Sequence, residues 1–517
     1  LALRGVAPQQ GQPRRAFIHD TRLFAVSDRN VATFNIGDRA APAKTAELDL
    51  STSAHRIVTT DTHVISLSND WWSGEPTLEI FNRADADEGA SLGKVSLRAL
   101  APGASGDCYG YSQWAAWYRA SVRVSGSYAY IVVPPGYYYY YGPRGGAPES
   151  PTPETIVGVV DLRDPTRPQI VGRLAIPATR IAGCTEVGGC GYSTLVDADD
   201  GAQYYYYGDT LAGGAAVVQH GSTLAMLETG RVSSDWRDST QTRTLRVVDL
   251  SNPARPALVA SVDLGNALGA TPLLLQGSTV YTSRWNAIPG APGRVRYWID
   301  RVDLATPAAP RVLPAVQVPG TLLAVDGSRV VAVGYQRLAT AATSWQDCYG
   351  RVGVRAYFDS QANACVTVRR SFKLLDVAGS VATLRQTLDL PEAMPSRVLT
   401  GDDRIFLGVQ PEYDYMTGRT SRSAAVLVYS GARAGTLALS SRVETADYGA
   451  LMAARGTRMV VQRSRGVVFY DTATPAAPSM LASVDLRGYG WASDLRLDAD
   501  RATCALGEWG IQTISLR

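Results

Sequence analysis

The stretch that decides the fold is VVDLRDPTRPQIVGRLAIP, residues 159–177. An apolar strand ends at Asp-Leu, a short turn with two prolines follows, and a second alternating strand comes next. Further copies are VVDLSNPARPALVASVDL (247–264), RVDLATPAAPRVLPAVQVPG (301–320), VFYDTATPAAPSMLASVDL (468–486) and FNIGDRAAPAKTAELDL (34–50). Recurrence of one supersecondary unit predicts a repeat fold rather than several unrelated domains.

A second unit precedes each copy and consists of a strand, a tight turn and another strand. Examples are TPLLLQGSTVYTSRW (271–285) and TLLAVDGSRVVAVGY (321–335), with glycine supplying the positive φ that two-residue hairpins need. Together the two units make four antiparallel strands, named a, b, c and d in chain order. Four short strands per repeat predict a β-propeller.

The number of repeats and the two chain ends suggest how the fold closes. We count nine strand-c segments, the last being GIQTISL (510–516), so residues 1–517 are predicted to form one all-β propeller of eight or nine blades. The last copy has strands a, b and c but no room for d. We expect LALRGV (1–6) to supply that strand, because closure of this kind hides exposed sheet edges.

The c–d unit resembles the LVIVD-type repeat of secreted bacterial and archaeal β-propellers. The resemblance is carried by VVDL (159–162), by the turns DPTRP (164–168) and NPARP (252–256), and by the strands after them. It implies the architecture only, and it supplies no catalytic residues.

Charge and cysteine content limit the partners and the compartment. A net charge of +3 on 517 residues gives no reason to expect nucleic acid or an anionic membrane as partner. No apolar run approaches the length of a membrane span. Six cysteines favour an oxidising compartment, so we expect a secreted, periplasmic or cell-surface protein. A start at Leu1 is compatible with a removed leader or a lipid anchor.

The long connections between expected strands fall at one end of each repeat. In an antiparallel blade the a–b and c–d turns share one end, and these are short throughout. The long segments join b to c or d to a; the largest are the insertions 99–118, 134–153, 178–212 and 336–369. Binding residues concentrate on loops held by a rigid scaffold, so this end is the expected working surface.

Cysteines and aromatic residues gather in these insertions. Cys184 and Cys190 are expected to close one small ring, and Cys348 and Cys365 to staple the longest insertion. Cys108 is left with Cys504 as its partner, unless Cys504 is a free buried thiol. The predicted ligand-binding residues are aromatic: Tyr109, Trp114, Trp117, Tyr137, Tyr138, Tyr139, Tyr140, Tyr141, Tyr204, Tyr205, Tyr206 and Tyr207. The alternative is that these rings pack on one another as a small core.

The acidic residues are expected to cap turns rather than to bind a metal ion. The aspartates that end strand c (Asp161, Asp249, Asp303, Asp376, Asp471) are predicted to cap turns. Asp85, Asp87 and Glu88, and Asp197, Asp199 and Asp200, alternate as Ca²⁺ ligands can, but neither has EF-hand spacing, so solvated turns are preferred to a calcium site. No cofactor is predicted.

Three functions remain open. The first is a secreted or surface binding protein that engages a protein or a glycan through its disulfide-stapled, Tyr-rich loops. The second is a propeller enzyme, a hydrolase or lyase, with a metal or paired carboxylates at the central channel. The third is a subunit of an extracellular assembly. The sequence contains no G-x-S-x-G elbow, phosphate loop or H-E-x-x-H motif, which favours the first.

Overall fold

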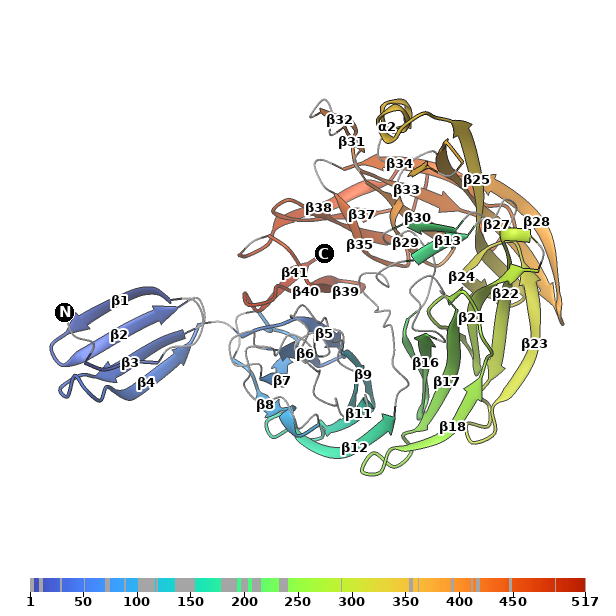
Figure 1. Ribbon diagram of the computed structural model, residues 1–517. Coiled ribbons are helices and arrows are strands. Elements are labelled where there is room, and N and C mark those ends of the chain that lie inside the picture. The colour runs from blue at the N-terminus through green and yellow to red at the C-terminus, as the bar shows by residue number, and fades with distance from the viewer. Residues whose placement is uncertain are drawn as a thin grey trace, which may run out of the picture. The chain divides into compact units, whose positions relative to one another are not determined.

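A computed structural model of the chain consists almost entirely of antiparallel β-sheets (Figure 1). The residues that the structure describes are 4–8, 13–27, 30–50, 52–69, 75–87, 90–100, 117, 120–134, 154–177, 193–196, 203–206, 215–231, 240–289, 291–352, 357–360, 362–391, 395–410, 412–414, 419–445, 449–488 and 490–516. None of the described helices is long and apolar enough to span a membrane.

The chain divides into two compact units. Unit 1 comprises residues 1–118, 161–170 and 486–517, and unit 2 comprises residues 119–160 and 171–485.

Unit 1 holds three sheets. The first contains β1 (Pro13–His19), β2 (Arg22–Ser27), β3 (Asn30–Asn35) and β4 (Ala43–Asp49). The second contains β5 (Arg56–Thr59), β6 (His63–Asn69), β7 (Pro76–Asn82) and β8 (Gly93–Ser96), followed by the 3₁₀ turn η1 (Arg98–Leu100). The last contains β39 (Asp494–Leu497), β40 (Arg501–Ala505) and β41 (Ile511–Ser515).

Unit 2 holds six larger sheets and two hairpins. The first three sheets are β9 (Ser121–Ser125), β10 (Tyr128–Val133), β11 (Glu154–Asp161), β12 (Gln169–Pro177); β15 (Val217–His220), β16 (Thr223–Arg231), β17 (Gln241–Asp249), β18 (Ala257–Asp263); and β19 (Gly269–Ala270), β20 (Leu274–Gln276), β21 (Thr279–Ile288), β22 (Ala291–Asp303), β23 (Arg311–Val318). The turn between β11 and β12 belongs to unit 1.

The other three sheets are β24 (Thr321–Asp326), β25 (Arg329–Ala341), β26 (Tyr357–Asp359), β27 (Ala364–Ala378), β28 (Val381–Asp389); β29 (Pro395–Thr400), β30 (Arg404–Val409), β33 (Ala425–Ser430), β34 (Ala438–Glu444); and β35 (Ala450–Arg455), β36 (Arg458–Arg463), β37 (Gly466–Asp471), β38 (Ser479–Asp485). The separate hairpins are β13 (Ser193–Val196) with β14 (Gln203–Tyr206), and β31 (Glu412–Asp414) with β32 (Arg419–Arg422). Among the described residues of unit 2, the helix α2 (Trp345–Val352) lies between β25 and β26.

The turn chemistry of the sequence explains these hairpins. Gly126, Gly221, Gly277, Gly327 and Gly456 begin two-residue a–b turns with φ between 56° and 62°, a region that costs other residues energy.

The c–d turns are held by the predicted aspartate caps. The carboxylates of Asp161, Asp249, Asp303 and Asp471 each accept the backbone N–H of the residue two positions on, at 2.9–3.0 Å. Asp376 is the exception, because β27 and β28 join through a two-residue turn; its carboxylate instead pairs with Arg385 at 2.6 Å and Arg329 at 3.8 Å.

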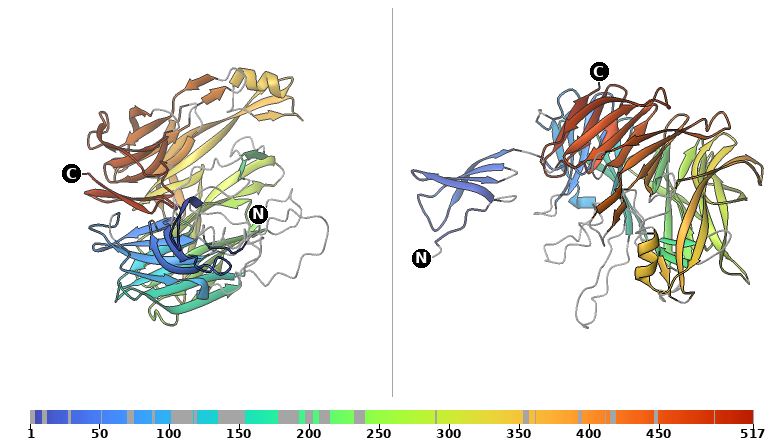
Figure 2. Two further views of the ribbon diagram at one scale, coloured as in Figure 1. Left: turned by 90° about the vertical axis from the view of Figure 1, so that its left-hand side faces the viewer. Right: turned by 90° about the horizontal axis from the view of Figure 1, so that it is seen from above.

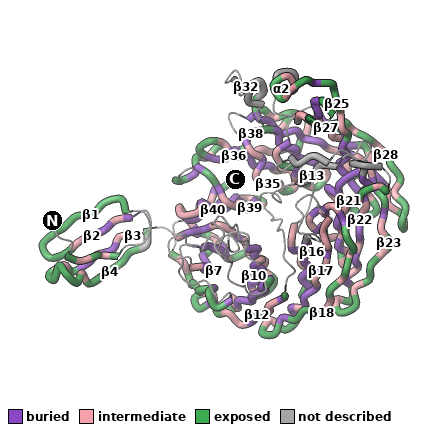
Figure 3. Tube along the Cα trace, viewed as in Figure 1, coloured by how far each residue is buried: buried purple, intermediate pink, exposed green. Residues whose placement is uncertain are grey.

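The core lies between neighbouring sheets. In unit 2 the largest apolar cluster joins the sheets that begin at β19, β24 and β29, through side chains such as Ile299, Val331 and Phe372 that are at most 4% exposed. Some b and c strands, such as β30 and β11, are buried on both faces, whereas in the d strand β38 exposed and half-buried residues alternate (Figure 3). Each sheet therefore depends on its neighbours for stability.

In unit 1 the last sheet packs directly on the second, although about 440 residues separate them (Figures 1 and 2). Ala54 and Gly507 exchange two backbone hydrogen bonds of 2.8 Å, and Arg83 forms an ion pair with Asp498 at 2.7 Å. Ile57, Phe81 and Ile511 are among the buried side chains between the two sheets.

The nine expected strand-c segments correspond to nine sheets of three or more strands among the described residues. The fold is thus all-β, with the four-stranded antiparallel blades of a propeller. Closure by residues 1–6 stays a prediction: residues 4–8 are not in a strand, residues 1–3 lie outside the described part, and β41 pairs within that part only with β40.

Candidate binding surface

In unit 2 the structure describes parts of long connections of both expected kinds: the β13–β14 hairpin lies between strand d (β12) and strand a (β15), and two other connections join b to c. Strands β25 and β27 remain paired from Arg329–Asp376 to Ala341–Ala364, so they carry their connection well beyond strands β24 and β28. The connection between β30 and β33 forms the β31–β32 hairpin. Figure 2 shows α2 and the two long strands that carry it projecting from the body of unit 2.

Residues 342–352, 357–360 and 362–365, here called the stapled module, form a small folded unit at the end of β25 and β27. A disulfide joins Cys348 in α2 to Cys365 in β27, as the sequence predicts. Both cysteines are 1% exposed and pack with Ala342 and Phe358. The bridge and this core fix the helix to the scaffold.

The start of α2 is capped by its own sequence. The hydroxyl of Ser344 accepts the N–H of Asp347 at 3.1 Å, and the Asp347 carboxylate accepts the N–H of Thr343 at 3.0 Å. These two bonds satisfy backbone N–H groups at the start of α2, which stabilises a helix that has only eight residues. An ion pair between Arg337 and Asp359, at 3.3 Å, braces the base of the module.

Trp345 is the large apolar side chain that this module exposes. It is 52% exposed, and its ring stacks on Tyr349 with centroids 5.0 Å apart and planes 19° apart. Tyr349 is only 8% exposed, so the buried tyrosine holds the tryptophan in place. The sequence pattern does not predict a role for Trp345; the one signal in the sequence is its position three residues before Cys348, a predicted bridging cysteine.

The structure describes few of the predicted aromatic residues. Tyr204, Tyr205 and Tyr206 lie in β14, paired with Leu195, Thr194 and Ser193 of β13. Trp117 is 5% exposed, which fits the alternative of a packed ring rather than a presented one. Outside the described residues lie Tyr109, Trp114, Tyr137, Tyr138, Tyr139, Tyr140, Tyr141, Tyr207, Cys108, Cys184 and Cys190.

Cys504 is a free thiol, which corrects the suggested bridge to Cys108. It lies in β40 with no exposed surface. Burial, together with the nearby Asp494 carboxylate, raises the pKa of the Cys504 thiol to about 12. The thiol therefore serves packing, which was the alternative that the sequence left open.

A buried charge cluster joins two sheets of unit 2. The Arg243 guanidinium of β17 is 0% exposed and donates to Asp300 of β22 at 2.7 Å. Arg284 of β21 shares the same carboxylate at 3.0 Å and lies 5.5 Å from the centroid of the Trp298 ring. Burial lowers the pKa of Arg243, and the Asp300 carboxylate opposes that shift. Sequence spacing could not reveal this cluster, because its members come from three different strands.

Of the two predicted acidic clusters, the structure describes only Asp85 and Asp87. Asp87 faces Arg487, 3.9 Å away, and accepts the N–H of Thr513 at 3.4 Å. Glu88, Asp197, Asp199 and Asp200 lie outside the described part of the chain. Within it, no three His, Cys, Asp or Glu side chains are grouped as metal ligands would be.

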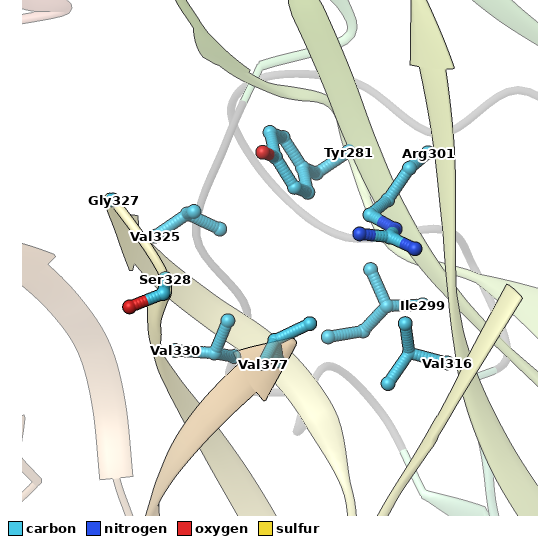
Figure 4. A pocket seen from close by; sticks show the side chains of 9 residues that line it. All are labelled: Tyr281, Ile299, Arg301, Val316, Val325, Gly327, Ser328, Val330 and Val377. Atoms are coloured by element: carbon cyan, nitrogen blue, oxygen red, sulfur yellow. The ribbon is translucent and has the colours of Figure 1, made fainter. Parts of the chain in front are cut away.

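A small cavity lies between two sheets of unit 2 (Figure 4). Its lining includes Tyr281 and Arg301 from one sheet and Val330 and Val377 from the next, and its volume is about 50 Å³. Sites for small organic ligands have volumes of roughly 300–1,000 Å³, so this cavity is a packing gap rather than a ligand site.

Comparison with known proteins agrees with the fold. The LVIVD repeat family model matches residues 118–137 and 240–264, the second of which covers β17 and β18. No curated protein matches the chain in sequence.

Several solved structures are similar to this chain at low sequence identity. The computationally designed Ika8 protein is 9% identical, with a TM-score of 0.46, over 90% of this chain and 96% of its own. The β-propeller domain of the Trilobed protease from Pyrococcus furiosus is 12% identical, with a TM-score of 0.35, over 77% of this chain and 97% of its own. The periplasmic gluconolactonase PpgL from Pseudomonas aeruginosa is 13% identical, with a TM-score of 0.34, over 80% and 92%.

The nine sheets define the class: this is an all-β protein with the blades of a β-propeller. Within that class, the chain carries LVIVD repeats.

Proposed function

We propose that this protein is a secreted, periplasmic or cell-surface binding protein whose blades act as a scaffold for a loop surface that engages a protein or a glycan. The observation that carries the proposal is the stapled module. It is built on a long b–c connection, it is held by the Cys348–Cys365 disulfide, and it presents Trp345. A pre-formed aromatic surface loses little entropy when a partner binds.

The disulfide also supports the proposed compartment, because such bonds persist mainly in oxidising surroundings. The opposite ends of the same sheets support the proposed polarity. There the a–b and c–d turns are short, as between β24 and β25 or between β27 and β28, which are joined by two residues each.

A glycan array tests the glycan form of the proposal. The folded protein, the Trp345→Ala variant and the Val381→Ala variant are compared on the same array. Val381 is a matched control, since it is 63% exposed and lies in the same sheet at its opposite end. We expect a saturable signal that Trp345→Ala reduces at least tenfold and Val381→Ala leaves unchanged.

Photo-cross-linking tests the protein form. A photo-reactive residue in place of Trp345 is expected to join the protein to one defined partner, and the same residue in place of Val381 is expected to capture none. If both positions give the same products, or if the array signal is equal in all three proteins, the stapled module is not the binding surface.

A further inference from the structure

The first sheet, β1–β4, is barely packed. All seven residues of β1 are exposed, among them Phe17 at 50% and Ile18 at 63% (Figure 3). The buried apolar side chains of this sheet are Ala25, Ala32 and Phe34. Strand a is better covered in other sheets; in β24, for example, Leu322 and Leu323 are at most 1% exposed. The first sheet therefore exposes apolar surface that other sheets bury against a neighbour.

The sequence of this sheet is nevertheless that of a sheet with a neighbour on its C-terminal side. A leucine follows strand d in several sheets, and Leu97, Leu390 and Leu486 are 0%, 7% and 6% exposed. The equivalent Leu50 is 52% exposed.

The linker between β4 and β5 also has the length found between other neighbouring sheets. Six residues separate β4 from β5, and five separate β28 from β29 as well as β34 from β35. Linker and leucine both indicate that β1–β4 is built to pack on β5–β8.

Contacts made by glycines indicate that β1–β4 also has a neighbour on its N-terminal side. Gly93 in β8 and Gly172 in β12 each belong to a strand d and lie against the proline turn of the next sheet. A Cβ at Gly93 would meet Pro165 O at 2.3 Å and Pro168 Cδ at 2.8 Å, and a Cβ at Gly172 would meet Pro253 O at 2.1 Å and Pro256 Cδ at 2.9 Å.

Gly5 repeats this contact on the turn of the first sheet. A Cβ at Gly5 would meet Arg39 O at 2.4 Å and Pro42 Cδ at 2.8 Å. Residues 4–8 thus stand where the strand d of a sheet preceding β1–β4 would stand.

The last sheet, β39–β41, lacks a strand d, which is the strand whose position residues 4–8 occupy beside the first sheet. Within the described residues it ends at β41 with three strands, whereas the other sheets, apart from the two hairpins β13–β14 and β31–β32, have at least four. It occupies the face of β5–β8 that the short β4–β5 linker would bring to β1–β4, through Ala54–Gly507 and Arg83–Asp498. Two sheets, β1–β4 and β39–β41, therefore fit one face of β5–β8.

We propose that the protein has a second closure, in which β1–β4 packs on β5–β8 and residues around Gly5 pair with β41 as the fourth strand of the last sheet. In the described closure β39–β41 itself covers β5–β8, and β1–β4 stays unpacked. The partner for the open edge of β41 is thus a segment of the same chain, and the two closures compete for one surface. This inference is independent of the proposed binding function.

Photo-cross-linking of the full chain tests it. Val6 is 67% exposed next to Gly5, so benzoylphenylalanine in its place leaves the described closure intact. Irradiation accumulates the product of the second closure even when that closure is a minor population. We expect cross-links from position 6 to residues 511–515 of the same molecule, identified by mass spectrometry.

Two variants provide the comparison. Leu50→Asp places a charge where the second closure needs an apolar side chain, and we expect it to reduce this cross-link at least tenfold. Val312→Asp makes the same kind of change at an equally exposed position (54%) in β23 and should leave the yield unchanged.

Three outcomes would overturn the proposal. They are cross-links only within residues 1–50, equal yields in the two variants, and cross-links between labelled and unlabelled chains in an isotopic mixture, which would mean that a second copy supplies the strand.

Discussion

Replacing Gly172 by alanine should push two neighbouring sheets of unit 2 apart. Its Cβ would lie 2.1 Å from the carbonyl oxygen of Pro253, where a real contact needs about 1 Å more. The obstacle is backbone on one side and a proline ring on the other, so no rotamer change relieves it. Overpacking of this kind costs about 3 kcal/mol, the upper end of its usual range. The reduced chain entropy of alanine offsets about 0.7 kcal/mol.

The expected net loss of unfolding free energy is therefore about 2 kcal/mol, measured by urea denaturation followed by tryptophan fluorescence. Gly379→Ala is the control, because Gly379 has φ of 58° and a Cβ there would meet no atom within 4 Å. Its cost is that of a left-handed alanine, about 1 kcal/mol. If Gly172→Ala is as stable as the parent protein, the proline turn and the facing glycine do not set the spacing between sheets.

Three other predictions address buried charge, acid stability and thiol reactivity. Asp300→Asn leaves Arg243 and Arg284 without their shared carboxylate and should destabilise the protein by about 3–5 kcal/mol in the same denaturation assay; a loss below about 1 kcal/mol would contradict the role of this cluster. The N–H of Ala305, followed by the Ser278 hydroxyl, lowers the pKa of Asp303, so its stabilisation is present above the ordinary value of 3.8 and is lost as pH falls through the lower folded pKa. Stability measured below that value should therefore fall less steeply in Asp303→Asn than in the parent protein, and equal slopes would remove Asp303 as a contributor. Cys504, with a pKa of about 12, should resist iodoacetamide at pH 8 in the folded protein and react after denaturation, which peptide mapping would show.

The parts of the fold that depend on neighbouring residues could be predicted from the sequence. Strand alternation, glycine turns and aspartate caps act over a few residues, so the hairpins and the capping roles of Asp161 and Asp303 follow from local patterns. Asp376 does not cap its turn as the pattern predicts, because β27 and β28 are joined by a turn of only two residues. The Cys348–Cys365 bridge was predictable for the same reason, since both residues belong to one insertion.

Features that depend on neighbours in space could not be predicted in this way. The cluster of Arg243, Arg284 and Asp300 joins strands from two sheets, and each residue alone resembles an ordinary polar position on a strand. Trp345 was missed because exposure is a property of the folded module rather than of its residue type. Such sites become visible only when the register between sheets is known.

The two ends of the chain show where repetition itself limits inference. In a repeat fold each sheet carries a face for the sheet before it and a face for the sheet after it, and these faces are chemically alike. The sequence between β4 and β5 therefore indicates a neighbour for β5–β8 as clearly as the Ala54–Gly507 and Arg83–Asp498 contacts do, yet the neighbours differ. Counting motifs gives nine sheets in either closure. Which sheet adjoins β5–β8 depends on the free-energy difference between burying the apolar surface of β1–β4 and keeping the apolar and polar contacts of β39–β41, and a local pattern contains neither quantity.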